Sequence, residues 1–232
     1  MKALVLHGFT GSLQTVAPLG AMLKEAGCTV SMPILRGHGT SPEHLFRVHW
    51  RDWVADAREA LVRLAPGSDE PVVVAGLSMG ALVSCILAAE FPRNVRRLAL
   101  IAPAFRFRSR LIHAIPLIKK VYSSWGGNPE FADPALLGSI NNYPSFPIES
   151  MEQTIALTRV AEDLLKSINC PVGAFYAKRD PVVHPKVLKL LDKKLGSGPS
   201  RKHVYKKSYH EMLCDVEGET VCTDVVNFLL KR

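Results

Sequence analysis

The sequence has no hydrophobic run long enough to cross a membrane, since a spanning helix needs about 20 consecutive apolar residues and none is present. It also contains no internal repeat and no low-complexity segment. A buried-strand pattern begins at Lys2 and leads directly into His7 and Gly8, which leaves no room for a signal peptide. We therefore expect a globular protein without a membrane span or a leader.

Cysteine is sparse, and its spacing indicates neither a disulfide framework nor a metal site. The five cysteines are an odd number and show neither paired nor metal-ligand spacing. They are Cys28, Cys85, Cys170, Cys214 and Cys222. This pattern predicts reduced thiols in a cytoplasmic protein with no bound metal. The simplest interpretation of Cys85 is a small buried apolar residue.

The regular part of the chain has the alternating pattern of an α/β protein. Buried-strand patterns occur at residues 2–6, 28–32, 72–74, 95–101, 171–177 and 201–206, and helical patterns separate most of them. This alternation predicts a mostly parallel six-stranded sheet with helices on both faces and right-handed crossovers. At 232 residues and 47% hydrophobic composition, the chain is long enough for one sizeable core. We expect a single domain with an insertion.

The alternating pattern breaks down after residue 102. Residues 103–150 contain six prolines and a Gly-Gly pair, which prevent long regular elements. Shorter helices are expected at residues 111–122 and 151–168. We assign residues 1–102 and 169–232 to the core and residues 103–168 to the insertion.

One pentapeptide has the context of a nucleophile elbow. The β-branched run at residues 72–74 leads into Gly-Leu-Ser-Met-Gly at residues 76–80, and a helix-forming segment follows. Such a turn would strain the backbone of Ser78, and Gly76 and Gly80 would remove collisions with neighbouring side chains. An oxyanion at Ser78 would face a helix N-terminus, which favours negative charge. The pentapeptide also occurs by chance in turns whose serine only caps a helix, but the flanking strand and helix favour the catalytic interpretation.

A serine nucleophile needs a histidine base, and the base needs a carboxylate that orients it. Ser78, Asp180 and His210 occur in the chain order expected for an elbow-type triad, and each follows a predicted strand. Because parallel strands end at the same edge of a sheet, we expect these side chains to meet there. Asp192 and Asp215 are weaker candidates for the acid, since the first lies in a predicted helix and the second lies too close to His210 in the sequence.

The sequence contains His-Gly-Phe-Thr-Gly at residues 7–11 and Gly-His-Gly at residues 37–39, in addition to the elbow pentapeptide. Together these three motifs resemble those of the α/β-hydrolase superfamily, and most closely those of bacterial carboxylesterases and monoacylglycerol lipases. The resemblance covers nearly the whole chain. It implies an oxyanion hole formed by the backbone N–H groups of Phe9 and Met79, and a small lid formed by the insertion. We interpret His7 and His38 as loop-shaping residues that hydrogen bond to the backbone.

These features predict a serine hydrolase of carboxylic esters that needs no metal or organic cofactor. His210 would take the proton of Ser78 during the attack, Asp180 would orient His210, and water would release the acyl-enzyme. Acyl thioesterases, acyltransferases, carbon–carbon bond hydrolases and cofactor-free peroxidases use the same triad, so these alternatives stay open. A non-catalytic ligand-binding protein is a more distant alternative, because such proteins usually lack a triad member. Dehalogenases and epoxide hydrolases are disfavoured, because they have a carboxylate in the place of Ser78.

The expected substrate is a small-molecule ester with an acyl chain. Eight apolar residues of the insertion are expected to line a pocket for a medium chain or to pack the insertion onto the core. They are Phe105, Phe107, Leu111, Ile112, Ile115, Leu117, Ile118 and Trp125. Neither the acyl-chain length nor the oligomeric state follows from the sequence.

The net charge of +8 is concentrated in two segments. Residues 186–207 carry eight Lys or Arg against one Asp, which we interpret as a solvated helix face, so no nucleic-acid partner is expected. Residues 105–120 carry five basic residues and no acid. Because Arg106, Arg108 and Arg110 alternate with apolar residues there, our hypothesis is a transient contact of the lid with an anionic lipid surface.

Overall fold

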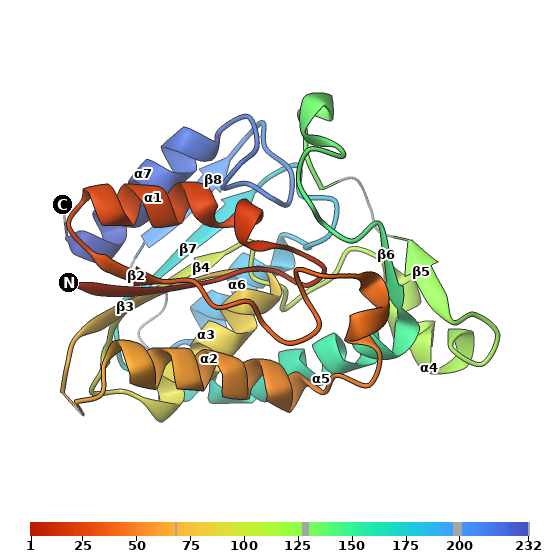
Figure 1. Cartoon of the computed structure of the whole chain (residues 1–232), viewed down its shortest axis with the longest axis horizontal. Helices are drawn as coiled ribbons and strands as arrows, with labels where there is room; N and C mark the ends of the chain where they lie inside the picture. The colour runs from red at the N-terminus through yellow and green to blue at the C-terminus, as the bar shows by residue number, and fades with distance from the viewer. Residues whose placement is uncertain (68, 127–129, 197–200, 232) are drawn as a thin grey trace.

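The computed structural model describes residues 1–67, 69–126, 130–196 and 201–231. Within these residues, six parallel strands form one sheet in the order β2-β1-β3-β4-β7-β8 (Figure 1). They are β1 (Lys2–Leu6), β2 (Thr29–Ser31), β3 (Val72–Leu77), β4 (Val95–Ile101), β7 (Val172–Ala177) and β8 (Arg201–Tyr205). The predicted parallel six-stranded sheet is confirmed. Strands β3 and β7 are buried along their whole length, as continuous apolar runs predict.

Helices cover both faces of this sheet (Figure 1). Helices α1 (Ala17–Glu25) and α7 (Gly218–Leu230) contribute to one apolar core. The other core contains side chains of α2 (Trp50–Leu64), α3 (Met79–Glu90), α5 (Ile148–Leu164) and α6 (Lys186–Lys194). Successive residues of β1 alternate between the two cores, Ala3 and Val5 on one side and Leu4 and Leu6 on the other, because side chains alternate across a strand.

Between β4 and β7 the chain leaves the sheet. It forms the short helices η3 (Arg110–Ala114), α4 (Ile115–Ile118), η4 (Pro134–Leu136) and η5 (Leu165–Ser167), the strands β5 (Ser124–Gly126) and β6 (Ser145–Pro147), and α5. Strands β5 and β6 pair as an antiparallel ribbon that was not predicted. Helical structure expected at residues 111–122 is present as η3 and α4, but it ends at Ile118 and is shorter than expected. The assignment of residues 103–168 to a separate insertion stays a prediction.

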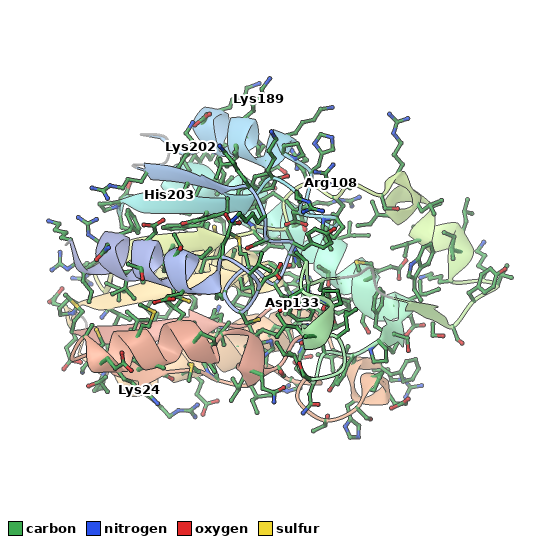
Figure 2. All side chains as sticks on the ribbon, turned by 90° about the horizontal axis from the view of Figure 1, so that it is seen from above. Lys24, Arg108, Asp133, Lys189, Lys202 and His203 are labelled. Atoms are coloured by element: carbon green, nitrogen blue, oxygen red, sulfur yellow. The ribbon has the colours of Figure 1, made fainter. Side chains whose placement is uncertain are left out.

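Helix α6 has the amphipathic character expected of the basic segment. It buries Val187 and Leu191 in the core, and Lys189 is exposed. Lys202 on β8 forms an ion pair with Asp192 of the same helix. Figure 2 shows Lys189 and Lys202 on the same outer side of the protein.

All five cysteines lie in the described part of the chain and are free. Cys85 on α3 is completely buried, as predicted. No helix in the described ranges is both long and apolar enough to span a bilayer. The cytoplasmic location stays a prediction.

Candidate active site

Ser78 occupies a strained turn between β3 and α3. Its φ of 54° and ψ of −113° lie outside the regions that residues with a side chain normally adopt. A Cβ atom on Gly76 would collide with the carbonyl oxygen of Gly80, and a Cβ atom on Gly80 would lie 2.5 Å from the carbonyl oxygen of Leu6. The predicted strain and the predicted need for both glycines are therefore confirmed.

The structure brings together Ser78, Asp180 and His210, which follow three different strands. Nε2 of His210 lies 2.8 Å from Oγ of Ser78, and Nδ1 lies 2.8 Å from Oδ2 of Asp180. A proton on Nδ1 directed at the carboxylate leaves Nε2 free to accept the hydroxyl proton of Ser78. All three side chains are buried. This is the relay geometry in which a histidine activates a serine.

Backbone groups fix the carboxylate of Asp180. Its Oδ1 accepts the N–H of Val182 at 2.7 Å and that of Val183 at 2.8 Å, which leaves Oδ2 for His210. The guanidinium of Arg108 donates to the carbonyl oxygen of Asp180. The acid is therefore oriented by the loop on which it lies.

The pKa of His210 reflects two opposing influences. Burial disfavours the charged imidazolium, but the carboxylate of Asp180, with further contributions from Glu211 and Glu130, outweighs burial and raises the pKa of His210 to about 9. An imidazole with this pKa binds a proton strongly, as a base that accepts the serine proton must. It loses the second proton of the imidazolium only on the alkaline side of neutrality.

The two amides expected to form the oxyanion hole belong to Phe9 and Met79. Met79 is the first residue of α3, so its N–H precedes the hydrogen-bond ladder of the helix. Phe9 lines the same cavity as Ser78. Nδ1 of His7 lies 2.8 Å from the carbonyl oxygen of Gly8. Because a peptide unit is planar and trans, this contact also directs the Phe9 N–H, which belongs to the same peptide.

The loop-shaping interpretation of His7 and His38 is confirmed. Nε2 of His7 accepts the N–H of Leu35 at 3.1 Å, and Nδ1 of His38 lies 3.1 Å from the carbonyl oxygen of the same residue. Burial lowers the pKa of His7 to about 4 and that of His38 to about 3. Both rings are therefore neutral near pH 7. His7 joins the loop after β1 to the loop after β2, and His38 stabilises the turn of that second loop.

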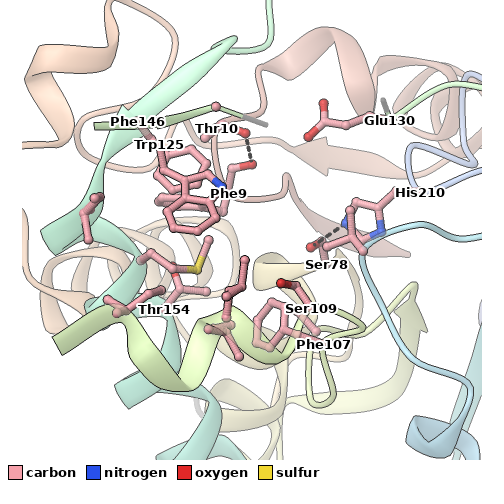
Figure 3. A pocket seen from close by; sticks show the side chains of 18 residues that line it. Phe9, Thr10, Ser78, Phe107, Ser109, Trp125, Glu130, Phe146, Thr154 and His210 are labelled. Carbon is pink, nitrogen blue, oxygen red and sulfur yellow. Dashed lines mark hydrogen bonds between the residues drawn. The ribbon is translucent and has the colours of Figure 1, made fainter. Parts of the chain in front are cut away.

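A cavity of about 280 Å³ opens at Ser78 and His210 (Figure 3). Five of the eight apolar residues expected to line it do so, namely Phe107, Leu111, Ile112, Ile115 and Trp125. Phe105 is instead buried in the core, Leu117 is exposed, and Ile118 is not among the lining residues. Phe146, Ile148, Met151 and Thr154 also line the cavity, and they were not predicted because β6 and α5 approach it only through the tertiary fold.

Two acidic residues near His210 were not predicted from the sequence. Glu211 is almost completely buried, and its Oε2 has no hydrogen-bond partner among the described residues. Burial, reinforced by Glu130, raises the pKa of Glu211 to about 8, and burial also raises the pKa of Glu130. The position of Glu211 directly after His210 in the sequence was the one signal that could have identified it as part of the site. These carboxyls do not form a metal site, because no group of potential ligands in the described ranges could hold an ion.

Comparisons with known sequences give the family. A family model described as "Serine aminopeptidase, S33" matches residues 2–135. A thermostable monoacylglycerol lipase of Bacillus sp. (strain H-257) is 28% identical over 99% of this chain and 90% of its own length. A carboxylesterase of Bacillus subtilis (strain 168) is 24% identical over 98% of this chain and 92% of its own length.

Solved structures agree with these sequence matches. A structure from work on LipS and LipT, two metagenome-derived lipolytic enzymes, has a TM-score of 0.89 and 28% identity, and the match covers 100% of this chain and 94% of the other. The monoacylglycerol lipase of Paleococcus ferrophilus has a TM-score of 0.79 at 16% identity, over 99% and 94% of the two chains, which supports the fold alone. Since the family model spans more than half of the sequence, the chain belongs to the serine aminopeptidase S33 family of α/β-hydrolases.

Proposed function

We propose that this protein hydrolyses carboxylic esters through an acyl-enzyme formed on Ser78. The observation that carries the proposal is the hydrogen-bond relay from Ser78 through His210 to Asp180, with 2.8 Å at each step, at the wall of an apolar cavity. The relatives named monoacylglycerol lipase and carboxylesterase support an ester as the substrate class.

The proposed reaction begins when Nε2 of His210 takes the hydroxyl proton and Oγ of Ser78 attacks the ester carbonyl. The Asp180 carboxylate stabilises the imidazolium that forms. The amides of Phe9 and Met79 hold the oxyanion, and each such donor contributes about 3 to 4 kcal/mol of transition-state stabilisation. The imidazolium then protonates the departing alcohol. Water, activated by the same histidine, releases the acid.

The cavity favours an ester whose acyl part is an aliphatic chain of medium length. Its lining includes the aromatic rings of Phe107, Trp125 and Phe146 and the aliphatic side chains of Ile115 and Met151. An acyl chain buried among such groups is stabilised by the removal of its apolar surface from water. We expect the preferred chain length to follow the depth of this cavity.

We also propose that the part of the insertion between β4 and β5 acts as a lid that touches a lipid surface. Its outer part exposes four large apolar side chains, Leu111, Leu117, Val121 and Tyr122, beside the exposed Arg110 and Lys120. Two basic residues of the original hypothesis are engaged elsewhere, since Arg106 forms an ion pair with Glu162 and Arg108 donates to the Asp180 loop. The proposed contact therefore depends more on apolar surface than on charge. Equal activity with neutral and anionic vesicles at low salt would contradict the electrostatic part of this proposal.

The central experiment is hydrolysis of a p-nitrophenyl ester series from acetate to palmitate, with Ser78→Ala as the control. Removal of the nucleophile should lower kcat by about six orders of magnitude. An acyl-CoA series of the same chain lengths tests the thioesterase alternative in parallel. Equal rates for Ser78→Ala and the wild type would disprove the acyl-enzyme, and faster turnover of acyl-CoA than of the matched ester would reassign the substrate class.

A further inference from the structure

Residues 130–143, here called the strap, connect two loops of the candidate active site. The histidine loop (residues 208–215) follows β8, and the oxyanion loop (residues 7–12) follows β1. In the sheet, β1 and β8 are separated by β3, β4 and β7, so neighbouring strands do not join the two loops directly. The strap leads through η4 to β6 (Figure 1), and its contacts reach both loops.

One end of the strap is fixed to the histidine loop by Asp215. This buried carboxylate accepts the N–H of Ala132 at 2.9 Å and the N–H of Asp133 at 3.1 Å. It also accepts the N–H of Tyr209, the residue before His210, at 2.6 Å. Asp133, the N-cap residue of η4, is labelled in Figure 2.

The residue after His210 is bound to the same end of the strap. The N–H of Glu211 donates to the carbonyl oxygen of Glu130 at 3.1 Å. The catalytic candidate His210 is thus flanked on both sides by residues whose backbone is fixed relative to the strap, through Asp215 on one side and directly on the other.

The other end of the strap is fixed around the oxyanion loop by Tyr143. Its N–H donates to the carbonyl oxygen of Thr10 at 2.9 Å, directly after Phe9. Its hydroxyl donates to the carbonyl oxygen of Gly37 at 3.0 Å and accepts the N–H of Thr40 at 2.8 Å. The buried Tyr143 therefore joins the oxyanion loop to the loop that contains the Gly-His-Gly motif.

A second contact fixes this end, and a third closes the strap on itself. The N–H of Asn141 donates to Oε1 of Gln14 at 2.7 Å. The side-chain amide of Asn142 donates to Oε2 of Glu130 at 2.6 Å. Because this last contact joins the first and the penultimate residue of the strap, a displacement at one end is transmitted to the other without passing through the residues between them.

We propose that the strap holds the histidine loop and the oxyanion loop at a fixed mutual position, with Asp215 and Tyr143 as its positioning residues. The inference depends on the proposed ester hydrolysis, in which both loops act on one carbonyl group. A displacement of reacting groups by about 1 Å lowers the rate about 100-fold. Asp215 and Tyr143 hold opposite ends of the strap. Loosening either end therefore loosens the position of the histidine loop relative to the oxyanion loop.

The test is a double-mutant cycle with Asp215→Asn and Tyr143→Phe. The first presents an amide to backbone N–H groups. The second removes the hydroxyl that binds Gly37 and Thr40 and keeps the backbone N–H bond to Thr10, so it loosens this end of the strap without detaching it. Each single variant should lower kcat for p-nitrophenyl butyrate about tenfold with little change in KM. The double variant should be little slower than the slower single variant, because either change alone already loosens the strap.

The matched controls are Asp224→Asn, which weakens a side-chain hydrogen bond between β8 and α7, and Tyr205→Phe, which removes it. Both should keep the kcat of the wild type. Gln14→Ala is a variant that should fold normally, because Gln14 is exposed. It should lower kcat by a smaller factor than Asp215→Asn or Tyr143→Phe.

Each outcome has a separate meaning. A wild type that hydrolyses no ester of the series contradicts the proposed function, and the strap inference with it. An active wild type whose single effects multiply in the double variant overturns the strap inference alone. Variants that melt at a lower temperature but keep the kcat of the wild type also overturn it, since they indicate a purely structural role.

Discussion

Gly8 packs so closely against Ser78 that a Cβ atom on Gly8 would lie 3.2 Å from the Cβ atom of Ser78. The loop after β1 therefore lies directly on the proposed nucleophile. A methyl group at Gly8 requires a displacement of a few tenths of an ångström, and the nearest groups are the β-carbon of Ser78 and the backbone of Leu77. Because the amide of Phe9 follows Gly8, that displacement moves the proposed oxyanion donor.

The first prediction concerns this contact. Gly8→Ala should lower kcat about 100-fold, which is comparable to the loss of one oxyanion donor, and should change the melting temperature little. Kinetics with a p-nitrophenyl ester and thermal unfolding provide the two measurements. Gly196→Ala is the control, since the nearest atom to a Cβ there is 3.9 Å away. A folded Gly8→Ala variant with the kcat of the wild type would contradict the assignment of Phe9.

The second prediction separates orientation of His210 from the shape of the site. Asp180→Asn preserves the volume and an oxygen that accepts the N–H groups of Val182 and Val183, but it no longer stabilises a proton on Nδ1 of His210. We expect kcat to fall about 10⁴-fold with the fold retained. Asp192→Asn, on the exposed face of α6, should behave as the wild type. A loss of less than tenfold in Asp180→Asn would show that another group orients the histidine.

The sheet and the three convergent side chains were predictable because their signals are local. A run of valines before Gly76 indicates a buried strand, and the carboxyl ends of parallel strands meet at one edge. Apolar residues at helical spacing similarly predict an amphipathic helix over residues 49–65, and α2 spans Trp50–Leu64 in the structure. In each case, a few neighbouring residues contain the whole pattern.

The features that were not predicted from the sequence depend on contacts between distant parts of the chain. The β5–β6 ribbon pairs Trp125 with Phe146, which lie about twenty positions apart in the sequence, and proline-rich sequence gives no period to detect. Similarly, Asp215 was considered only as a rival acid for His210. It accepts hydrogen bonds from the backbone N–H groups of Ala132 and Asp133. Every residue type except proline provides such a group, so no sequence pattern indicates these bonds.

The third prediction follows from the pKa of His210, which is raised to about 9 although burial alone would lower it. At pH values below this pKa the imidazole is protonated and accepts no proton from Ser78. The value of kcat/KM should therefore rise with pH, with a midpoint on the alkaline side of the ordinary histidine value near 6.5. A pH–rate profile of the wild type with a p-nitrophenyl ester measures this midpoint.

Glu211→Gln should move the same midpoint to lower pH. The carboxyl of Glu211 is one of the groups that stabilise the imidazolium, together with Asp180 and Glu130, and glutamine removes its charge at similar size. Asp215 and Cys214 also face Glu211 and are unchanged in this variant. Glu219→Gln, at an exposed position, is the control and should leave the midpoint of the pH–rate profile unchanged. An unchanged midpoint in Glu211→Gln would show that this residue is neutral throughout the titration of His210.

The fourth prediction concerns acyl-chain length. Thr154 on α5 is buried and lines the end of the cavity away from Ser78 and His210 (Figure 3). Thr154→Phe should fill that end, so kcat/KM should fall at least tenfold for p-nitrophenyl decanoate and stay near the wild-type value for the acetate, which does not reach the new ring. Thr154→Val is the matched control, because it removes the hydroxyl that donates to Ser150 at nearly constant volume and should keep the wild-type preference. An equal fall for all chain lengths in Thr154→Phe would show that the acyl chain does not extend toward α5.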